Sequence, residues 1–353
     1  MNFCKIFLIL GFLLLTGLLT FNFFLVEKFQ VNIMDVIANI PLSEGEMKGS
    51  IGKFGRNYPP VIKGLWEPSS IHFSKALRDA DRLKEIGVNT VCVSVEYEFD
   101  DDGNYYLAGD ERTLISNIIK AKRKGFAVLV APNFVTPSFM EREKLPVNME
   151  EFIRISHEIA IKWANISEQY GVEFFAPQNE FDVMASRFVN SNEERFNLTA
   201  AWHREILPDI RKVFHGKLIA KLADASPDMN LSGYDLIGIT VFHGNLDLEE
   251  FRKEVKEEYR AAANSARISN ARWMVSEAWF PYGGPFYPET VNRKGELLDE
   301  LQDDYIRISI DEYLNTPGNP PAGYIFTAWT MPGMDVRGRE AERVIRQFFL
   351  ERI

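Results

Sequence analysis

Two glutamates, each carried by a short apolar run, are the residues of this chain whose types and spacing best suit catalysis. Glu180 ends the segment 172–180, and Glu277 lies in the segment 273–279. A charge is costly to place among buried apolar residues, so an acid delivered by such a strand indicates a functional position. Two such strands predict a pair of facing carboxyl groups. In glycoside hydrolysis, one carboxyl group protonates the leaving oxygen while the other attacks the sugar or activates water.

Alternating strand-like and helical patterns must position these two acids. Eight apolar runs predict strands at Val61–Trp66, Val88–Val95, Ala127–Asn133, Val172–Gln178, Lys217–Ala223, Leu236–Phe242, Trp273–Glu277 and Tyr324–Trp329. Amphipathic patterns predict helices at Lys75–Ile86, Arg112–Lys124, Met149–Tyr170, Glu193–Val213, Leu248–Ser265, Leu297–Leu314 and Glu340–Leu350. The strands are mostly continuous Val, Ile, Leu and Phe, which is typical of parallel strands buried on both faces. No glycine-rich phosphate-binding turn follows the first strand, so the alternation favours a (β/α)₈ barrel over a doubly wound sheet.

The ends of the predicted strands bring polar and aromatic residues to one rim of the barrel. In barrels of this kind, the carboxyl ends of the strands form the active site. Glu180 follows the fourth strand and Glu277 ends the seventh, so both acids fall on that rim. Trp66, Asn133 and Trp279 lie at strand ends as well, and we expect them to contact the substrate. Sugars have apolar ring faces and polar edges, which suit aromatic and amide side chains.

The pattern of these strand ends resembles clan A of the retaining glycoside hydrolases. The resemblance is carried by Asn179 and Glu180 after the fourth strand, Glu277 on the seventh and Trp329 on the eighth. It implies that Glu180 is the general acid and base, that Glu277 is the nucleophile, and that Asn179 binds the sugar 2-hydroxyl. It also implies that Trp329 forms the apolar floor under the sugar and that His243, after the sixth strand, contacts the nucleophile.

The second strand departs from this family pattern. Many members end it with an arginine that supports the nucleophile, whereas this chain has Val95, Glu96, Tyr97 and Glu98 there. We therefore expect a different set of residues around the nucleophile, with Glu96 or Tyr97 facing the substrate.

Composition narrows the class of partner. The net charge is −10, which argues against nucleic acid or an anionic membrane surface as the main partner and suits a neutral sugar. The five histidines are scattered without a pair at metal-binding spacing, so we expect no metal and no cofactor. The two cysteines, Cys4 and Cys92, predict no internal disulfide, and we expect a monomer.

The N-terminal segment is predicted to lie outside the catalytic fold. Ile6–Val26 contains no charged residue and is long enough to cross a membrane as a helix. No small-x-small cleavage site follows it, which favours a retained signal-anchor over a cleaved signal. The predicted organisation is an N-terminal transmembrane helix in residues 1–28, a linker in 29–60 and the catalytic barrel in 61–353. The barrel would then be extracytoplasmic, anchored to the membrane or, if the signal is cleaved, secreted.

The sequence thus predicts a retaining glycoside hydrolase that cleaves a β-linked oligosaccharide or polysaccharide by double displacement. Two alternatives remain. A carbohydrate-binding barrel without catalysis would keep the aromatic residues but would not need both acids. A transglycosylase would use the same residues and pass the sugar to a second sugar in place of water.

Overall fold

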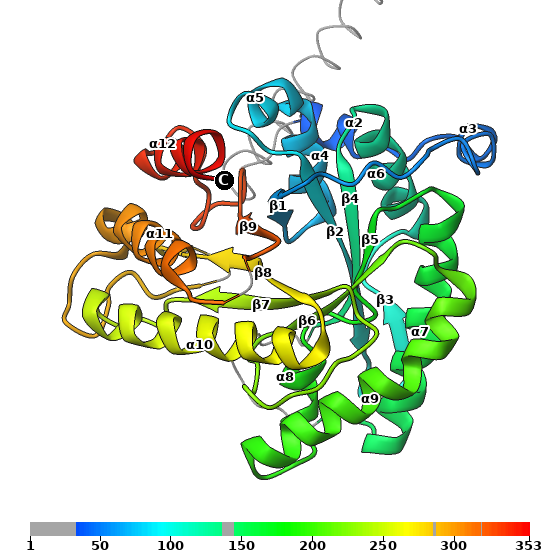
Figure 1. The fold of residues 1–353 in the computed structure, drawn as a ribbon. Coiled ribbons are helices and arrows are strands. Elements are labelled where there is room, and N and C mark those ends of the chain that lie inside the picture. The colour runs from blue at the N-terminus through cyan, green and yellow to red at the C-terminus, as the bar shows by residue number, and fades with distance from the viewer. Residues whose placement is uncertain (1–32, 136–144, 285–286, 319) are drawn as a thin grey trace, which may run out of the picture.

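Eight parallel strands form a closed barrel in the computed structural model, which describes residues 33–135, 145–284, 287–318 and 320–353 (Figure 1). The strands are β1 Ile62–Glu67, β2 Thr90–Phe99, β4 Ala127–Phe134, β5 Phe174–Phe175, β6 Lys217–Leu222, β7 Leu236–Phe242, β8 Arg272–Trp279 and β9 Gly323–Thr327. Strand β1 pairs with both β2 and β9, and this pairing closes the ring. The predicted (β/α)₈ barrel is confirmed. A short strand that was not predicted, β3 Tyr105–Leu107, forms an antiparallel hairpin with β2.

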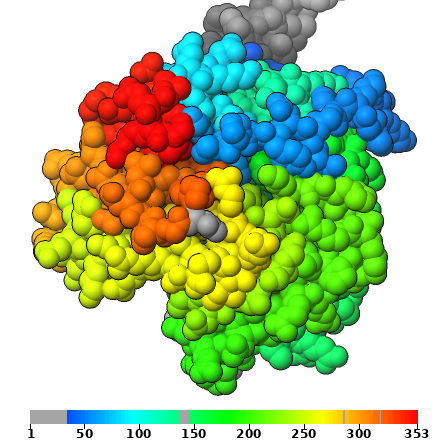
Figure 2. All heavy atoms as spheres, viewed as in Figure 1, coloured from blue at the N-terminus to red at the C-terminus, as the bar shows by residue number. Residues whose placement is uncertain are grey.

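Helices surround the barrel in the order that the sequence predicted (Figure 1). They are α4 Ser70–Arg78, α5 Ala80–Glu85, α6 Glu111–Arg123, α7 Met149–Gln169, α8 Phe181–Ala185, α9 Asn192–Val213, α10 Leu248–Ser269, α11 Leu298–Asn315, α12 Glu340–Gln347 and a π-helical turn, η1 Phe348–Arg352. The expected helix at 75–86 is two helices, because the chain leaves helical geometry at Asp79. The C-terminal helix α12 lies beside the α4–α5 region, where Arg82 pairs with Glu342 (Figure 2).

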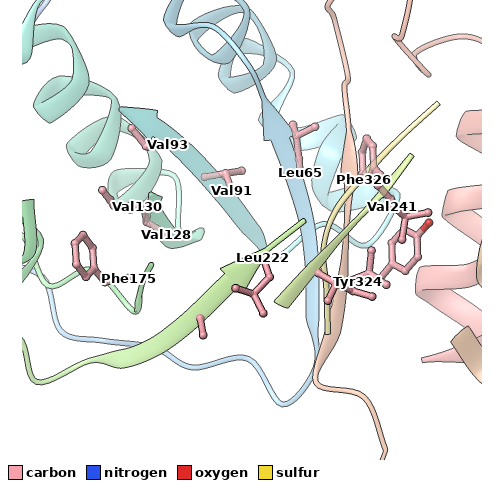
Figure 3. Close-up of a cluster of buried hydrophobic side chains, with 14 of the residues drawn as sticks. Leu65, Val91, Val93, Val128, Val130, Phe175, Leu222, Val241, Tyr324 and Phe326 are labelled. Carbon is pink, nitrogen blue, oxygen red and sulfur yellow. The ribbon is translucent and has the colours of Figure 1, made fainter. Parts of the chain in front are cut away.

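The alternation of side chains along each strand divides the core into two layers. Outward-facing residues pack against the helices and include Leu65, Val91, Val128, Leu222 and Phe326 (Figure 3). Inward-facing residues form a smaller cluster inside the barrel, which includes Trp66, Cys92, Leu129, Phe174, Ile219, Met274 and Ile325. Because successive side chains of a strand alternate between the two faces, Lys221, two residues after Ile219 on β6, also points into the barrel.

The segment between the predicted anchor and the barrel is not a free linker where the structure describes it. It contains two short helices, α2 Ile33–Ala38 and α3 Glu44–Lys48. The Lys120 ammonium on α6 donates to the carbonyls of Ala38 and Ile40, at 2.8 and 2.9 Å. The Leu42 N–H donates to Ser116 Oγ at 2.8 Å, and Met47 is buried against the barrel. Residues 33–50 therefore contribute contacts to the barrel fold.

These contacts predict that a chain beginning at Ser50 is less stable than one beginning at Ile33. The shorter chain loses the burial of Met47, worth about 1.5–3 kcal/mol, and the hydrogen bonds to Ser116 and Lys120. We expect its melting temperature, followed by circular dichroism, to be lower by several degrees. Equal melting temperatures for the two chains would show that residues 33–49 add no stability.

The predicted membrane anchor, Ile6–Val26, lies outside the described residues. Within the part of the chain that the structure describes, no helix combines the length and the apolar character needed to span a bilayer. Membrane attachment through residues 1–28 stays a prediction.

Candidate active site

Glu180 reaches the rim through an irregular extension of β5. The extension is held by backbone bonds to both neighbouring strands: the Asn179 N–H donates to the Pro132 carbonyl, and the Glu180 N–H donates to the Lys221 carbonyl at 3.1 Å. Glu180 itself has φ 51° and ψ 51°, a left-handed conformation that is uncommon for a residue with a side chain. Such conformations concentrate at functional sites, where the surrounding structure holds them in place. Helix α8 begins directly after this turn.

Glu277 is aimed by a bulge in β8. In the pairing of β7 with β8, Ile239 lies opposite Val275, but the next residue, Thr240, lies opposite Glu277. Ser276 is the extra residue, and its hydroxyl donates to the Ile239 carbonyl at 3.1 Å. A bulge of this kind turns the side chains that follow it to the other face of the strand. Glu277 therefore projects beside Thr240.

The two acids meet at the ammonium group of Lys221. Lys221 Nζ lies 2.8 Å from Glu277 Oε2 and 3.5 Å from Glu180 Oε1. It also lies 3.3 Å from Thr240 Oγ1, whose hydroxyl in turn donates to Glu180 Oε1. The Lys221 side chain is completely buried, while the side chains of Glu180 and Glu277 keep 22% and 14% exposure. The predicted pair of carboxyl groups thus shares one buried cation.

In this cluster, burial and the opposite charge of the partner shift the pKa values of Glu277 and Lys221 in opposite directions. Burial raises the pKa of Glu277, Lys221 counteracts that rise, and the carboxylate of Glu180 adds to it. Burial alone would lower the pKa of Lys221, but Glu277 and Glu180 together raise it above its ordinary value. Lys221 is therefore a cation at neutral pH.

An open cleft lies in front of the carboxyl pair and encloses about 950 Å³, counting its mouth. Six of the eight residues predicted for the site line it: Trp66, Asn133, Asn179, Glu180, Glu277 and Trp279. Its apolar wall is completed by Phe134, Val135, Val183, Met184, Met331 and Met334, and its polar lining by Ser94, Glu96, Arg187 and Thr327. Apolar walls with a few placed polar groups are typical of ligand sites.

Two of these lining residues are well suited to hold a sugar. Trp279 stacks on Phe242 with ring centroids 4.5 Å apart, which fixes the indole at the edge of the cleft. Asn179 is 6% exposed, and its Oδ1 accepts no hydrogen bond from the described residues. A buried acceptor without a partner is costly, so a ligand hydroxyl would satisfy it.

Of the two strand-β2 residues considered above, Glu96 faces the cleft and Tyr97 does not. Tyr97 is buried, and its hydroxyl accepts a hydrogen bond from Trp163 Nε1 at 3.1 Å. Burial raises the pKa of Glu96 to about 7, and the nearby Glu98 adds to the rise. The cleft thus has a third carboxyl group, carried by β2.

The structure corrects the role expected of Trp329. Its side chain is fully buried away from the cleft, where its indole N–H donates to Asp79 Oδ2 at 3.0 Å and the Arg82 guanidinium lies over the ring. Strand β9 ends at Thr327, two residues earlier than predicted, and Thr327 is the residue that lines the cleft. Trp329 therefore supports the fold and does not form the floor of the cleft.

His243 is the second correction. Its Nε2 lies 2.7 Å from the Pro281 carbonyl, and its Nδ1 accepts from the Asn245 N–H, so the ring is neutral with its proton on Nε2. Burial lowers its pKa to about 4, and its ring stacks on Tyr305. Nε2 thus holds the loop after β8, and Nδ1 holds the loop after β7. His243 therefore supports these two loops and does not contact Glu277.

Sequence reasoning missed Lys221 and Thr240, the two residues that join the acids. The signal for Lys221 was a charged residue at an inward-facing position of an otherwise apolar strand, which is the pattern that revealed Glu277. No cluster of potential metal ligands occurs in the ranges that the structure describes.

Comparisons with known proteins find relatives by structure alone. No family model matches the sequence, and no curated protein matches it. A GH113 β-1,4-mannanase has a TM-score of 0.63 at 17% identity, over 83% of this chain and 100% of its own. The GH113 β-mannanase from Alicyclobacillus acidocaldarius has a TM-score of 0.62 at 14% identity, over 82% of this chain and 97% of its own. A β-D-glucuronidase from Dictyoglomus thermophilum has a TM-score of 0.55 at 11% identity, over 83% of this chain and 51% of its own.

These likenesses establish the fold. The structural neighbours of the chain are GH113 mannanases of clan A and other glycoside hydrolases, and the chain has their parallel eight-stranded (β/α)₈ barrel.

Proposed function

We propose that the protein is a retaining glycoside hydrolase in which Glu277 is the nucleophile and Glu180 is the general acid and base. The proposal rests on one observation: the carboxyl groups of Glu180 and Glu277 both pair with the Lys221 ammonium and both line an open cleft. A binding barrel without catalysis would have no reason to keep two partly exposed acids around one buried cation. Carboxyl groups close together suit direct attack on the sugar, while inverting enzymes separate them to admit water.

The reaction proceeds in two displacements. The Glu277 carboxylate attacks the anomeric carbon as the bond to the leaving oxygen breaks, and Glu180 gives its proton to that oxygen. Water then enters, Glu180 takes a proton from it, and the resulting hydroxide displaces Glu277 to give a sugar of the original configuration. Thr240 binds Oε1 of Glu180, so Oε2 is the oxygen available to carry the transferred proton.

A neutral β-1,4-linked polysaccharide, with mannan as the first candidate, is the substrate we propose. Three acids, Glu96, Glu180 and Glu277, line the cleft with one base, Arg187, and this excess of carboxyl groups disfavours a uronic acid by like-charge repulsion. The mannanase neighbours are covered over nearly their whole length, whereas the glucuronidase is covered over about half. The carboxyl groups of the cleft and the fuller coverage of the mannanases both support a mannanase-like substrate over a glucuronide.

A substrate panel tests this proposal. Release of reducing ends would be measured on β-mannan, other β-1,4-linked polysaccharides and aryl β-glycosides that include a glucuronide, with Glu277→Gln as the inactive control. We expect activity on a neutral polymer and a first product of β configuration by NMR. Activity on the glucuronide alone would overturn the substrate class, and a first product of α configuration would overturn the retaining mechanism. Transfer to an added sugar in preference to water would identify a transglycosylase.

A further inference from the structure

The side chain of Lys221 contacts both proposed catalytic acids. Its ammonium is completely buried and is not among the groups that line the cleft. A buried ammonium needs partners for its three protons. Here the partners lie in three directions: Glu277 on β8, Thr240 on β7 together with Glu180, and the ring of Trp66 on β1, whose centroid is 4.6 Å from Nζ.

The backbone of Lys221 contributes a second link. Its carbonyl accepts the N–H of Glu180, the residue that adopts the left-handed conformation. The same residue therefore fixes the turn that presents Glu180 and binds the carboxyl group that the turn presents. Room for this arrangement comes partly from Gly238, which pairs with Lys221 in the sheet and has no side chain to crowd the bulge at Ser276.

We propose that Lys221 is a positioning residue, which keeps Glu277 ionised as the attacking carboxylate and, through Thr240 and its own carbonyl, holds Glu180 against it. This inference rests on the proposed function, because it assigns the residue that organises the two acids of that function. Lys221 itself does not touch the substrate, since its side chain has no exposed surface.

The groups around Lys221 and Glu277 determine in which direction the pKa of Glu277 changes when Lys221 is replaced. Glu277 is surrounded by Lys221 and Glu180, and Lys221 is surrounded by Glu277, Glu180 and the thiol of Cys92 on β2. Burial raises the pKa of the Cys92 thiol, which therefore stays neutral and cannot replace the missing charge. Removing the ammonium leaves burial and Glu180 to act unopposed. The pKa of Glu277 then rises, and the ionised nucleophile is lost at a higher pH than in the wild type.

A direct titration tests the contact without relying on activity. Chains labelled with ¹³C at the glutamate side-chain carboxyl carbon would be titrated by NMR, with the Glu277 signal assigned by Glu277→Gln. Glu180→Gln is compared with Glu180→Gln combined with Lys221→Met. The double variant removes one negative and one positive charge together, so no unpaired charge is left in place of the pair. Because both chains lack the Glu180 charge, the difference between them gives the effect of Lys221 on the pKa of Glu277. We expect the midpoint of Glu277 to rise by about 1–3 pH units when the opposite charge is removed.

The pH profile of Lys221→Met alone gives a second readout. On an activated aryl glycoside, the acidic limb of kcat/KM should move to higher pH in the same direction, so that the loss is greatest at low pH. The matched control is Lys217→Met, on the same strand at the other end of the barrel, where the ammonium lies over Tyr58. Its profile should match that of the wild type.

The outcomes separate the inference from the proposed function. A rise of the Glu277 midpoint by one pH unit or more supports the positioning role, and a smaller change overturns it. An active wild type whose Lys221→Met profile falls equally at every pH shows that Lys221 only stabilises the fold, which also overturns it. A wild type that is inactive on the whole panel refutes the proposed function, while the NMR comparison still decides whether Lys221 controls Glu277.

Discussion

Replacement of Glu277 by glycine is expected to abolish turnover on every substrate, with a loss on the order of 10⁴-fold or more. Without the carboxylate no covalent sugar intermediate forms on this residue. The loss should be as large for an activated aryl glycoside as for a polysaccharide, since both require the nucleophile. Steady-state kinetics on the two substrates would measure it.

A matched control and a chemical complementation make this test specific. Glu158→Gln removes an exposed acid on α7, one that pairs with Arg154 and does not line the cleft, and it should keep wild-type kinetics. Azide added to Glu277→Gly can enter the space left by the carboxylate and attack the sugar once, which gives a glycosyl azide of inverted configuration. A glycosyl azide of retained configuration from this variant would show that the nucleophile is another residue.

The barrel could be predicted because its strands are continuous apolar runs whose burial depends on little besides their composition. The strand predicted at 236–242 matches β7 at both ends, and six of the seven helical patterns end within a few residues of the observed helices. Strand β3 was not predicted, because three residues with exposed tyrosines carry no apolar pattern. The break between α4 and α5 was missed for a similar reason: Asp79 does not interrupt the amphipathic pattern.

The sequence predicted the site residues that stand out as charges in apolar strands, but not those whose position depends on where a strand ends or how it pairs. Glu180 and Glu277 were conspicuous as acids among apolar residues, and six of the eight predicted residues line one cleft. Trp329 was misplaced because β9 ends two residues before the predicted end, and that shift moved the indole from the cleft to a buried site against Asp79. Lys221 was missed because only the pairing of strands shows that its side chain points toward both acids.

The bulge at Ser276 shows how strongly the chemistry depends on such details. With regular pairing, Ser276 would lie opposite Thr240 and Glu277 would point to the other face of β8. The extra residue brings Glu277 to the same face as Thr240 and within 2.8 Å of Lys221. A sequence pattern can therefore identify an acid on a strand, but the side on which the acid acts is decided by the three-dimensional register.

Replacement of Glu180 by glycine should produce a different defect from the loss of Glu277. A general acid contributes about 10²–10⁴-fold when the leaving group needs its proton, so cleavage of a polysaccharide should fall by that factor. An aryl glycoside with a good leaving group needs little protonation, and its first displacement should stay fast. The covalent intermediate on Glu277 then waits for a base that is missing, which should appear as a rapid burst of product followed by slow turnover and a lowered KM.

Azide distinguishes the two variants by the configuration of their products. In Glu180→Gly it attacks the intermediate on Glu277 from the side where water would enter, so turnover is restored and the glycosyl azide has retained configuration. Rapid mixing would show the burst, mass spectrometry would show the sugar attached to the peptide that contains Glu277, and NMR would give the configuration. A burst in Glu277→Gly in place of Glu180→Gly would reverse the two roles. If azide restored neither variant, the carboxyl pair on Lys221 would not be a catalytic pair, and the carbohydrate-binding barrel would be the better description of the site.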